Sequence, residues 1–345
     1  MIRKILWIFA GFALLSTAAF AATTAAPTYT VAKTIALGSP TDFDFVVFDP
    51  VMNRAYFSHG SEVSVIDGRT GSLLGALKGI DGAHSVAPVP AMNRVYADSG
   101  NNHMLYAYDA RNFKKLAAIP VVSDTDAMTY DPASHQVFAF GGDAHAVSVI
   151  DPKTNKVVAT IALDGSPEEA VPDGTGKVFV NISDLNEIKQ IDARTNKVTA
   201  TWSVPGCPNI HGLAIDTETH RLFASCKDNA KMIVVDANNG KVLASLPIGL
   251  GTDGAAFDPI RHLAFSSNKD GTLSIIKENG PDSFTNLGSI KTIPGAKNMA
   301  VNPTTGRIFL ISGKAQSILP GNPGGAPDIQ FVPGSIFALI LDPAS

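Results

Sequence analysis

Ionisable side chains recur in this chain at a fixed distance before an aromatic residue. The aromatic residues of seven similar segments are Tyr56, Tyr96, Phe138, Phe179, Phe223, Phe265 and Phe309. Twelve residues before them stand, in the same order, Asp44, His84, Asp126, Pro167, His211, Asp253 and Lys297. Six of these seven are ionisable, whereas only about a fifth of positions would be ionisable at ordinary composition. The spacing therefore marks one recurring position as a candidate functional site.

Carboxylates and imidazoles gathered around one axis support two kinds of chemistry. Histidine nitrogens and carboxylate oxygens coordinate divalent metals, and acid–base pairs act on polar substrates such as sugars or lactones. The candidate metal ligands are His84, His211, Asp126 and Asp253. The candidate ligand-binding residues are Asp44, His84, Asp126, Glu169, His211, Asp253 and Lys297, with Glu168 or Glu169 replacing Pro167. A ring of solvated polar residues without a ligand is the alternative interpretation.

The two cysteines add a second feature. Cys207 lies four residues before His211, and Cys226 ends a strand of the same segment. In an oxidising compartment, such a pair favours a disulfide that closes a small loop. The alternatives are a copper site formed by both thiols with His211, and two free thiols.

Composition and missing motifs exclude several classes of protein. Hydrophobic residues make up 45% and charged residues 17%, so the chain can bury a core. Its 27 basic and 31 acidic residues leave a net charge of −4, which argues against a nucleic-acid partner. The sequence contains no G-x-S-x-G elbow, P-loop, H-E-x-x-H, C-x-x-C-H or EF-hand loop. Binding is therefore favoured over catalysis.

The first 21 residues have the pattern of a secretory signal. Arg3 and Lys4 precede an apolar run from Ile5 to Ala19, and Ala19-Phe20-Ala21 matches a cleavage site. The run is shorter than the ~20 residues that a spanning helix needs. We expect cleavage after Ala21, a periplasmic or secreted protein without stable membrane insertion, and one domain over residues 22–345.

The elements that must position these residues follow from an internal repeat. Each unit has four short β-branched segments separated by Gly, Pro and Asn turns, and the third segment ends in Asp67, Asp109, Asp151, Asp192 or Asp236. Four strands in about 42 residues are typical of a β-propeller blade. The aspartates are expected to cap the following turn through an Asx hydrogen bond. The fold prediction is all-β, a seven-bladed β-propeller with four antiparallel strands per blade.

The two ends of the chain are predicted to complete the last blade together. Val31–Gly38 copies a fourth strand and Ser335–Asp342 copies a third strand. We expect the N-terminal strand to pair with the C-terminal one, which removes open sheet edges. In this ring the connections that enter each innermost strand meet at one channel mouth. The recurring ionisable position lies on these connections.

Motifs of the form D-P…R-V-Y…V-x-V-I-D…T-x-K-V-x-A-T-I resemble the YVTN-type, YncE-like family of secreted propellers. The resemblance covers about Tyr29 to Asp342, although VFVN and LFAS replace the literal YVTN string. It implies the fold and leaves the activity open, because related propellers include sugar-lactone hydrolases, surface-layer proteins and redox-associated proteins.

Three functions remain after these observations. The first is a monomeric exported binding or scaffold protein that holds a small polar ligand or a divalent metal at the channel mouth. The second is a metal-dependent hydrolase of a lactone or sugar-derived ester. The third is a protein-interaction module that uses the rim and the long loop Gly313–Gly334, which is expected to be a lid, a partner-binding loop or a plain insertion. His59 and His145 are further candidates on the same face.

Overall fold

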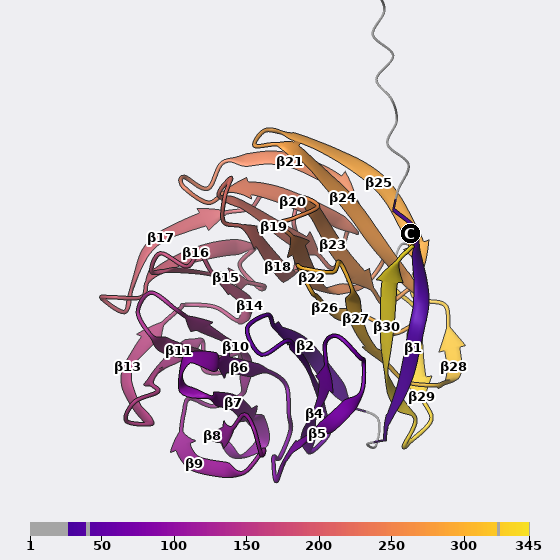
Figure 1. Ribbon diagram of the computed structural model, residues 1–345. Coiled ribbons are helices and arrows are strands. Elements are labelled where there is room, and N and C mark those ends of the chain that lie inside the picture. The colour runs from indigo at the N-terminus through magenta and orange to yellow at the C-terminus, as the bar shows by residue number, and fades with distance from the viewer. Residues whose placement is uncertain (1–26, 39–41, 323–324, 345) are drawn as a thin grey trace, which may run out of the picture.

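Four-stranded antiparallel sheets follow one another around a ring in the computed structural model (Figure 1). The structure describes residues 27–38, 42–322 and 325–344. The expected secretory signal lies outside the described residues. Among the residues described, there is no helix with the length and apolar character to cross a bilayer.

The first six blades are each continuous in sequence, with the earliest strand innermost. Blades 1 to 3 consist of β2 (Phe43–Asp49), β3 (Arg54–His59), β4 (Glu62–Asp67) and β5 (Leu73–Lys78); β6 (Val86–Val89), β7 (Arg94–Ser99), β8 (Met104–Asp109) and β9 (Lys115–Pro120); and β10 (Thr125–Asp131), β11 (Gln136–Gly141), β12 (Ala146–Asp151) and β13 (Lys156–Ala162). Two short 3₁₀ helices in blade 2 are η1 (Pro90–Met92) and η2 (Gly100–Asn102).

Blades 4 to 6 repeat the same order. They consist of β14 (Pro167–Pro172), β15 (Lys177–Ile182), β16 (Glu187–Asp192) and β17 (Lys197–Ser203); β18 (Ile210–Asp216), β19 (Arg221–Cys226), β20 (Lys231–Asp236) and β21 (Val242–Pro247); and β22 (Thr252–Asp258), β23 (Leu263–Asn268), β24 (Thr272–Gly280) and β25 (Ser283–Lys291).

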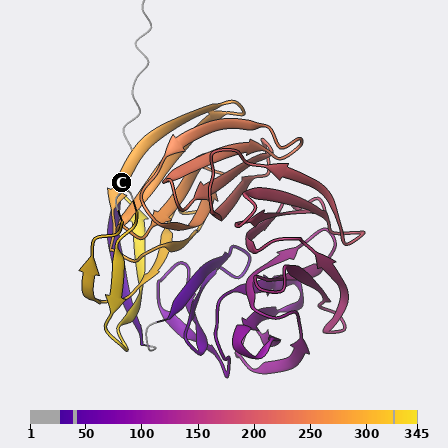
Figure 2. The ribbon, with the colours of Figure 1, turned by 180° about the vertical axis from the view of Figure 1, so that it is seen from behind.

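Blade 7 joins the two ends of the chain. Its strand order is β26 (Asn298–Val301), β27 (Ile308–Ser312), β30 (Ile336–Pro343) and β1 (Tyr29–Gly38). β1 pairs antiparallel with β30 along its length, and the two lie side by side in Figures 1 and 2. The predicted seven-bladed ring, with its last blade closed by the N-terminal strand, is confirmed.

The turns between the third and fourth strands follow the expected capping pattern. Oδ1 of Asp67 accepts hydrogen bonds from the backbone N–H groups of Arg69 and Thr70 at 3.0 and 2.7 Å. A short side chain that bonds the backbone two and three residues on favours a tight turn. The same bond to the residue two positions on recurs at Asp109, Asp151, Asp192 and Asp236.

The core lies between the blades. Seven hydrophobic clusters fill the seven interfaces between neighbouring blades. The seven aromatic residues used to count along the sequence are all buried in them, with at most 1% of their surface exposed. Burying one such side chain stabilises the fold by about 1.5–3 kcal/mol. Strands that are apolar on both faces therefore pack blade against blade and hold the innermost strands around the axis.

The long segment after β27 forms an extra hairpin. It contains β28 (Ala315–Leu319) and β29 (Asp328–Phe331), which pair only with each other. Phe331 contacts Phe43 edge-on, with 5.3 Å between ring centroids. Since Phe43 opens the innermost strand of blade 1, the hairpin lies next to the channel mouth.

Candidate functional site

Most of the predicted residues meet at one mouth, but not on the connections where they were expected. Asp44, Asp126, His211 and Asp253 are the second residues of their innermost strands, and only His84 and Lys297 precede theirs. A cavity of about 180 Å³ lies at this mouth. It is lined by Asp44, Phe45, Asp126, Glu168, His211, Lys227, Asp253, Lys297 and Asn298. His84 joins it through Asp44 and Asp126, so six residues of the counted set meet around one axis.

One half of the mouth is a histidine between two carboxylates. Nδ1 of His84 lies 3.2 Å from Oδ2 of Asp44 and 3.2 Å from Oδ1 of Asp126. The ligand atoms of these three residues, which come from three blades, all lie within 4.8 Å of one another. All three side chains are half-buried, so the group is open to solvent from the mouth.

Neighbouring groups hold this arrangement in place. Asn298 donates from Nδ2 to Oδ1 of Asp44 at 3.0 Å, which leaves Oδ2 facing His84. The buried carboxylate of Asp98 accepts the backbone N–H groups of His84 and Ser85 at 3.0 and 2.7 Å. These two bonds hold the residues just before β6, which starts at Val86, and the backbone N–H of Phe45 donates to the carbonyl of His84 at 3.0 Å.

The electrostatics of this half depend on one shared proton. Hydrogen bonds to Asp126 and Asp44 raise the pKa of His84 to about 11, against the effect of burial. Burial and the charge of Asp126 raise the pKa of Asp44 to about 6, against the hydrogen bond from His84. At neutral pH His84 is therefore an imidazolium between two carboxylates. A single N–H cannot donate with good geometry to both of them.

The other half of the mouth pairs carboxylates with several cations. Oδ1 of Asp253 lies 3.0 Å from Nδ1 of His211 and 3.0 Å from Nζ of Lys227, and its Oδ2 accepts from Lys297. Burial alone would raise the pKa of Asp253, but Lys297, His211 and Lys227 hold it well below its ordinary value. Nδ1 of His211 also lies 3.3 Å from Oε2 of Glu168.

The twelve-residue count fails in blade 4, because one turn there is shorter. In blade 1, Asp49 pairs with Arg54 across the first turn. At the same point of blade 4, Asp173 is bonded to Lys177, so the turn between the paired residues is one residue shorter. The residue equivalent to Asp44 is therefore Glu168, not Pro167. With this correction, all seven mouth positions are ionisable.

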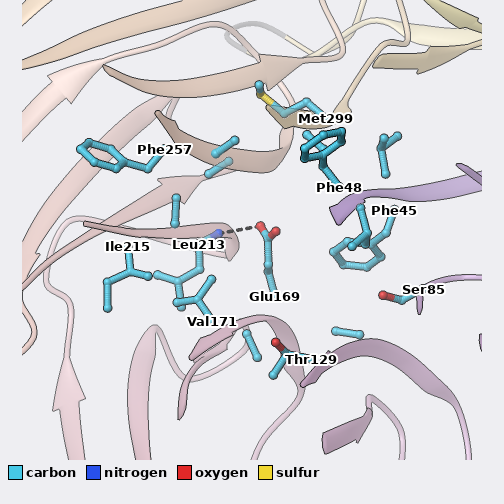
Figure 3. Close-up of a pocket in the computed structure, with 18 of the residues that line it drawn as sticks. Phe45, Phe48, Ser85, Thr129, Glu169, Val171, Leu213, Ile215, Phe257 and Met299 are labelled. Carbon is cyan, nitrogen blue, oxygen red and sulfur yellow. Dashed lines mark hydrogen bonds between the residues drawn. The ribbon is translucent and has the colours of Figure 1, made fainter. Parts of the chain in front are cut away.

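Glu169, the other candidate of that blade, lies one layer deeper. It lines a channel cavity of about 350 Å³ whose walls are mostly apolar, and its Oε2 accepts the backbone N–H of Leu213 at 2.7 Å (Figure 3). Burial raises its pKa to about 8, against its backbone hydrogen bonds. Glu169 therefore belongs to the channel wall, whereas Glu168 belongs to the mouth.

The four candidate metal ligands do not form one group. His84 and Asp126 lie together with Asp44, whereas His211 and Asp253 form a separate pair with the two lysines. Sequence reasoning did not assign Lys227 and Asn298 to the site. Neither residue stands at the recurring position twelve residues before an aromatic residue. Lys227 follows the second strand of blade 5, and Asn298 comes directly after Lys297.

The remaining candidates lie elsewhere. His59 is fully buried, its Nε2 lies 2.8 Å from Oγ of Ser64, and burial lowers its pKa to about 4. His145 is an exposed turn residue with a φ of 47°. Cys207 and Cys226 form a disulfide, which leaves no thiolate for a copper site with His211.

Comparison with known proteins supports the fold alone. No family model matches the chain, and no curated protein matches its sequence. Among solved structures, it is similar to U3-55K (TM-score 0.72, 10% identity, 92% of this chain and 98% of the other) and to a chain of the mitotic checkpoint complex (0.71, 15%, 89% and 95%). It is also similar to hydrazine synthase of Kuenenia stuttgartiensis (0.68, 14%, 79% and 92%). At these identities the likeness extends to the propeller architecture.

Proposed function

We propose that this chain is an exported binding propeller that holds a divalent metal ion at its channel mouth, on Asp44, His84 and Asp126. The observation that carries the proposal is the convergence of one imidazole nitrogen and two carboxylate oxygens from three blades. Imidazole and carboxylate ligands together suit Zn²⁺ and similar first-row ions. The metal would be held at the entrance, where a small polar ligand can reach it from solvent.

The distances support this assignment. A tetrahedral site with bonds of about 2.0–2.1 Å separates neighbouring ligand atoms by about 3.3 Å. The two nitrogen–oxygen distances at His84 are both 3.2 Å. Small movements of three half-buried side chains would therefore place all three atoms on one ion. The bond from Asn298 to Asp44 supplies the outer support that metal ligands usually have.

The opposite half of the mouth suits a different role. Lys227 and Lys297 already neutralise Asp253, so a metal ion there would compete with two ammonium groups. These lysines instead favour an anionic group on the bound ligand. A metal on one side and two lysines on the other fit a small anionic or polar ligand.

Export and family form part of the same proposal. The disulfide between Cys207 and Cys226 supports an oxidising compartment, since such bonds are rare in the cytosol. The repeat motifs support an assignment to the YVTN-type secreted propellers. Both statements are tested by locating the processed protein in cell fractions and sequencing its N-terminus, which should begin after Ala21.

The metal proposal is tested by zinc titration of the chelator-treated protein. We expect Asp126→Asn to weaken zinc binding at the mouth by at least about 100-fold, because it removes a direct ligand and not only an outer support. Isothermal titration calorimetry with ZnCl₂ measures the affinity. His84→Ala should have a similar effect.

The matched control is His145→Asn, which removes an exposed imidazole on a neighbouring loop and keeps a residue suited to positive φ. It should leave the affinity for zinc unchanged. Equal zinc affinity in the wild type, Asp126→Asn and His84→Ala would contradict the proposal. Assaying the zinc-loaded protein for lactone hydrolysis separates binding from the hydrolase alternative.

A further inference from the structure

Glu278 stands at a position where blades 1, 2, 4 and 5 have glycine or alanine, and where blades 3 and 7 have proline. At this position near the end of the third strand, the backbone N–H donates to a carbonyl of the first turn in the same blade. Gly68 donates to Asn53 at 2.8 Å in blade 1, and Glu278 donates to His262 at 3.0 Å in blade 6, where β24 continues to Gly280. The residues that make this bond in blades 2, 4 and 5 are Ala110, Ala193 and Ala237. Blade 6 therefore places a carboxyl group where the other blades have glycine, alanine or proline.

The carboxyl group is buried and incompletely paired. Only 3% of Glu278 is exposed, and its Oε2 has no hydrogen-bond partner among the described residues. A buried carboxylate with a free oxygen is costly unless a proton or a cation satisfies it. Burial and the neighbouring carboxyl group of Asp216 raise the pKa of Glu278 to about 7, against the hydrogen bond from Thr219 and the charge of Arg221.

A second buried carboxylate faces the same hydroxyl group. Oγ1 of Thr219 lies 2.8 Å from Oε1 of Glu278 and 2.8 Å from Oδ2 of Asp216, which is 2% exposed. The hydroxyl group has one proton and can satisfy only one of the two. The nearby guanidinium of Arg221 bonds other groups: the carbonyls of Thr219, His220 and Pro281 and the carboxylates of Asp236 and Asp282.

His262 completes the group with a nitrogen ligand. One ring nitrogen of His262 and one oxygen each of Asp216 and Glu278 lie within 4.8 Å of one another. His262 is half-buried, so solvent reaches the cluster on its side. A histidine nitrogen and two carboxylate oxygens, with a threonine hydroxyl between them, match the ligand types that Zn²⁺ binds.

We infer that Asp216, His262 and Glu278 form a second divalent-metal site, between blades 5 and 6 and apart from the channel mouth. β18 carries His211 at its mouth end and ends at Asp216. The two residues are five positions apart along the strand, or about 17 Å. The site therefore lies on the opposite face of the ring and joins two neighbouring blades through one ion.

Three variants isolate this site, and each uses residues that the repeat itself tolerates. Glu278→Ala installs the residue found at this position in blades 2, 4 and 5. His262→Asn keeps a residue that accepts positive φ, as Asn53 and Asn93 do in the same turn. His220→Asn makes the same change in the equivalent turn of blade 5, at an imidazole that is not one of the three proposed ligands, and serves as the control.

The experiment counts zinc ions per chain after equilibrium dialysis of the full chain against ZnCl₂, by metal analysis. We expect two ions in the wild type and in His220→Asn, one in Glu278→Ala and His262→Asn, and one in Asp126→Asn. Two ions in both Glu278→Ala and His262→Asn would overturn the inference. One ion in the wild type that Asp126→Asn removes would overturn it as well and leave the mouth site intact.

The opposite result separates the two proposals in the other direction. One ion in the wild type that Glu278→Ala removes and Asp126→Asn retains supports the site between the blades and contradicts the one at the mouth. No bound zinc in the wild type overturns both. Circular dichroism of each variant confirms that the sheet content is unchanged before metal is counted.

Discussion

The carboxyl group of Glu169 shows how one residue can make the stability of the ring depend on pH. It faces a channel lined by apolar side chains, and two backbone N–H groups only partly offset its burial. Its pKa is about 8 in the folded protein, above the ordinary value of 4.5. Below pH 4.5 the group is protonated in both states and has no effect. Between pH 4.5 and 8 the unfolded chain loses the proton first, so the folded state becomes less stable as pH rises.

We therefore predict that Glu169→Gln becomes more stable than the wild type as pH increases. The advantage should grow by at most about 1.4 kcal/mol per pH unit between pH 5 and 8 and then level off. Urea unfolding at a series of pH values measures it, and the two proteins should unfold alike near pH 4. A glutamine variant that is destabilised equally at every pH would contradict this account.

The identity of the mouth residues could be predicted from the sequence to within one residue. Counting back from an aromatic residue reaches the right side chain wherever the intervening turn has the same length, as it does for His84 and His211. It fails at Pro167, because the turn Asp173–Lys177 is one residue shorter. Spacing also cannot show that Asp253 is neutralised by two lysines, since Lys227 reaches it from a different connection.

At the level of elements, the disulfide fixes the connection that leads into β18, the strand that carries His211. Cys207 precedes β18 and Cys226 ends β19, 19 residues later. Both are buried in the cluster between blades 4 and 5. Between the two cysteines, Oδ1 of Asn209 lies 2.9 Å from Nε2 of His211. From β15 of blade 4, Asn181 donates to the carbonyl of His211 at 2.7 Å. The covalent bond thus limits how far this side of the mouth can move.

We predict that the double change Cys207→Ala and Cys226→Ala lowers the free energy of unfolding by about 3 kcal/mol, as expected for a closed loop of this length. Chemical denaturation under non-reducing conditions measures the loss. Dithiothreitol should destabilise the wild type and leave the double variant unchanged. Equal midpoints for the oxidised wild type and the double variant would show that the bond does not contribute.

The strands of the blades could be predicted from the sequence, whereas the position of the segment between β27 and β30 could not. Alternating β-branched stretches and capping aspartates predict the blades, because each strand follows a local pattern and a local turn. The hairpin of β28 and β29 has no counterpart in the repeat. Its position depends on a contact between Phe331 and Phe43, which are far apart in the sequence.

Over the whole molecule, stability depends on closing the ring. Blade 7 holds its outermost strand from the other end of the chain, and Arg307 clamps the blade by a two-point ion pair to Asp342 at 2.6 and 2.8 Å. The same guanidinium donates to the carbonyls of Gly68 and Arg69 in blade 1. The sequence predicted that the two end strands pair, but it did not predict these side-chain bonds. Side-chain bonds between the first and last blades leave no signal in the repeat.

Deleting residues 1–38 should therefore destabilise the entire ring. The deletion removes β1, leaves β30 paired on one side only, with β27, and takes Ile35 and Leu37 away from the cluster between blades 7 and 1. Since both side chains are only half-buried, their burial contributes about 1.5–3 kcal/mol in total. The exposed edge of β30 offers a template for pairing with a second molecule. Calorimetry should show a lower melting temperature, and light scattering should show self-association that increases with concentration. The control lacks residues 1–26 and keeps every β1 pair. If both truncated proteins were monomeric and had the same melting temperature, the N-terminal strand would not contribute to the stability of the ring.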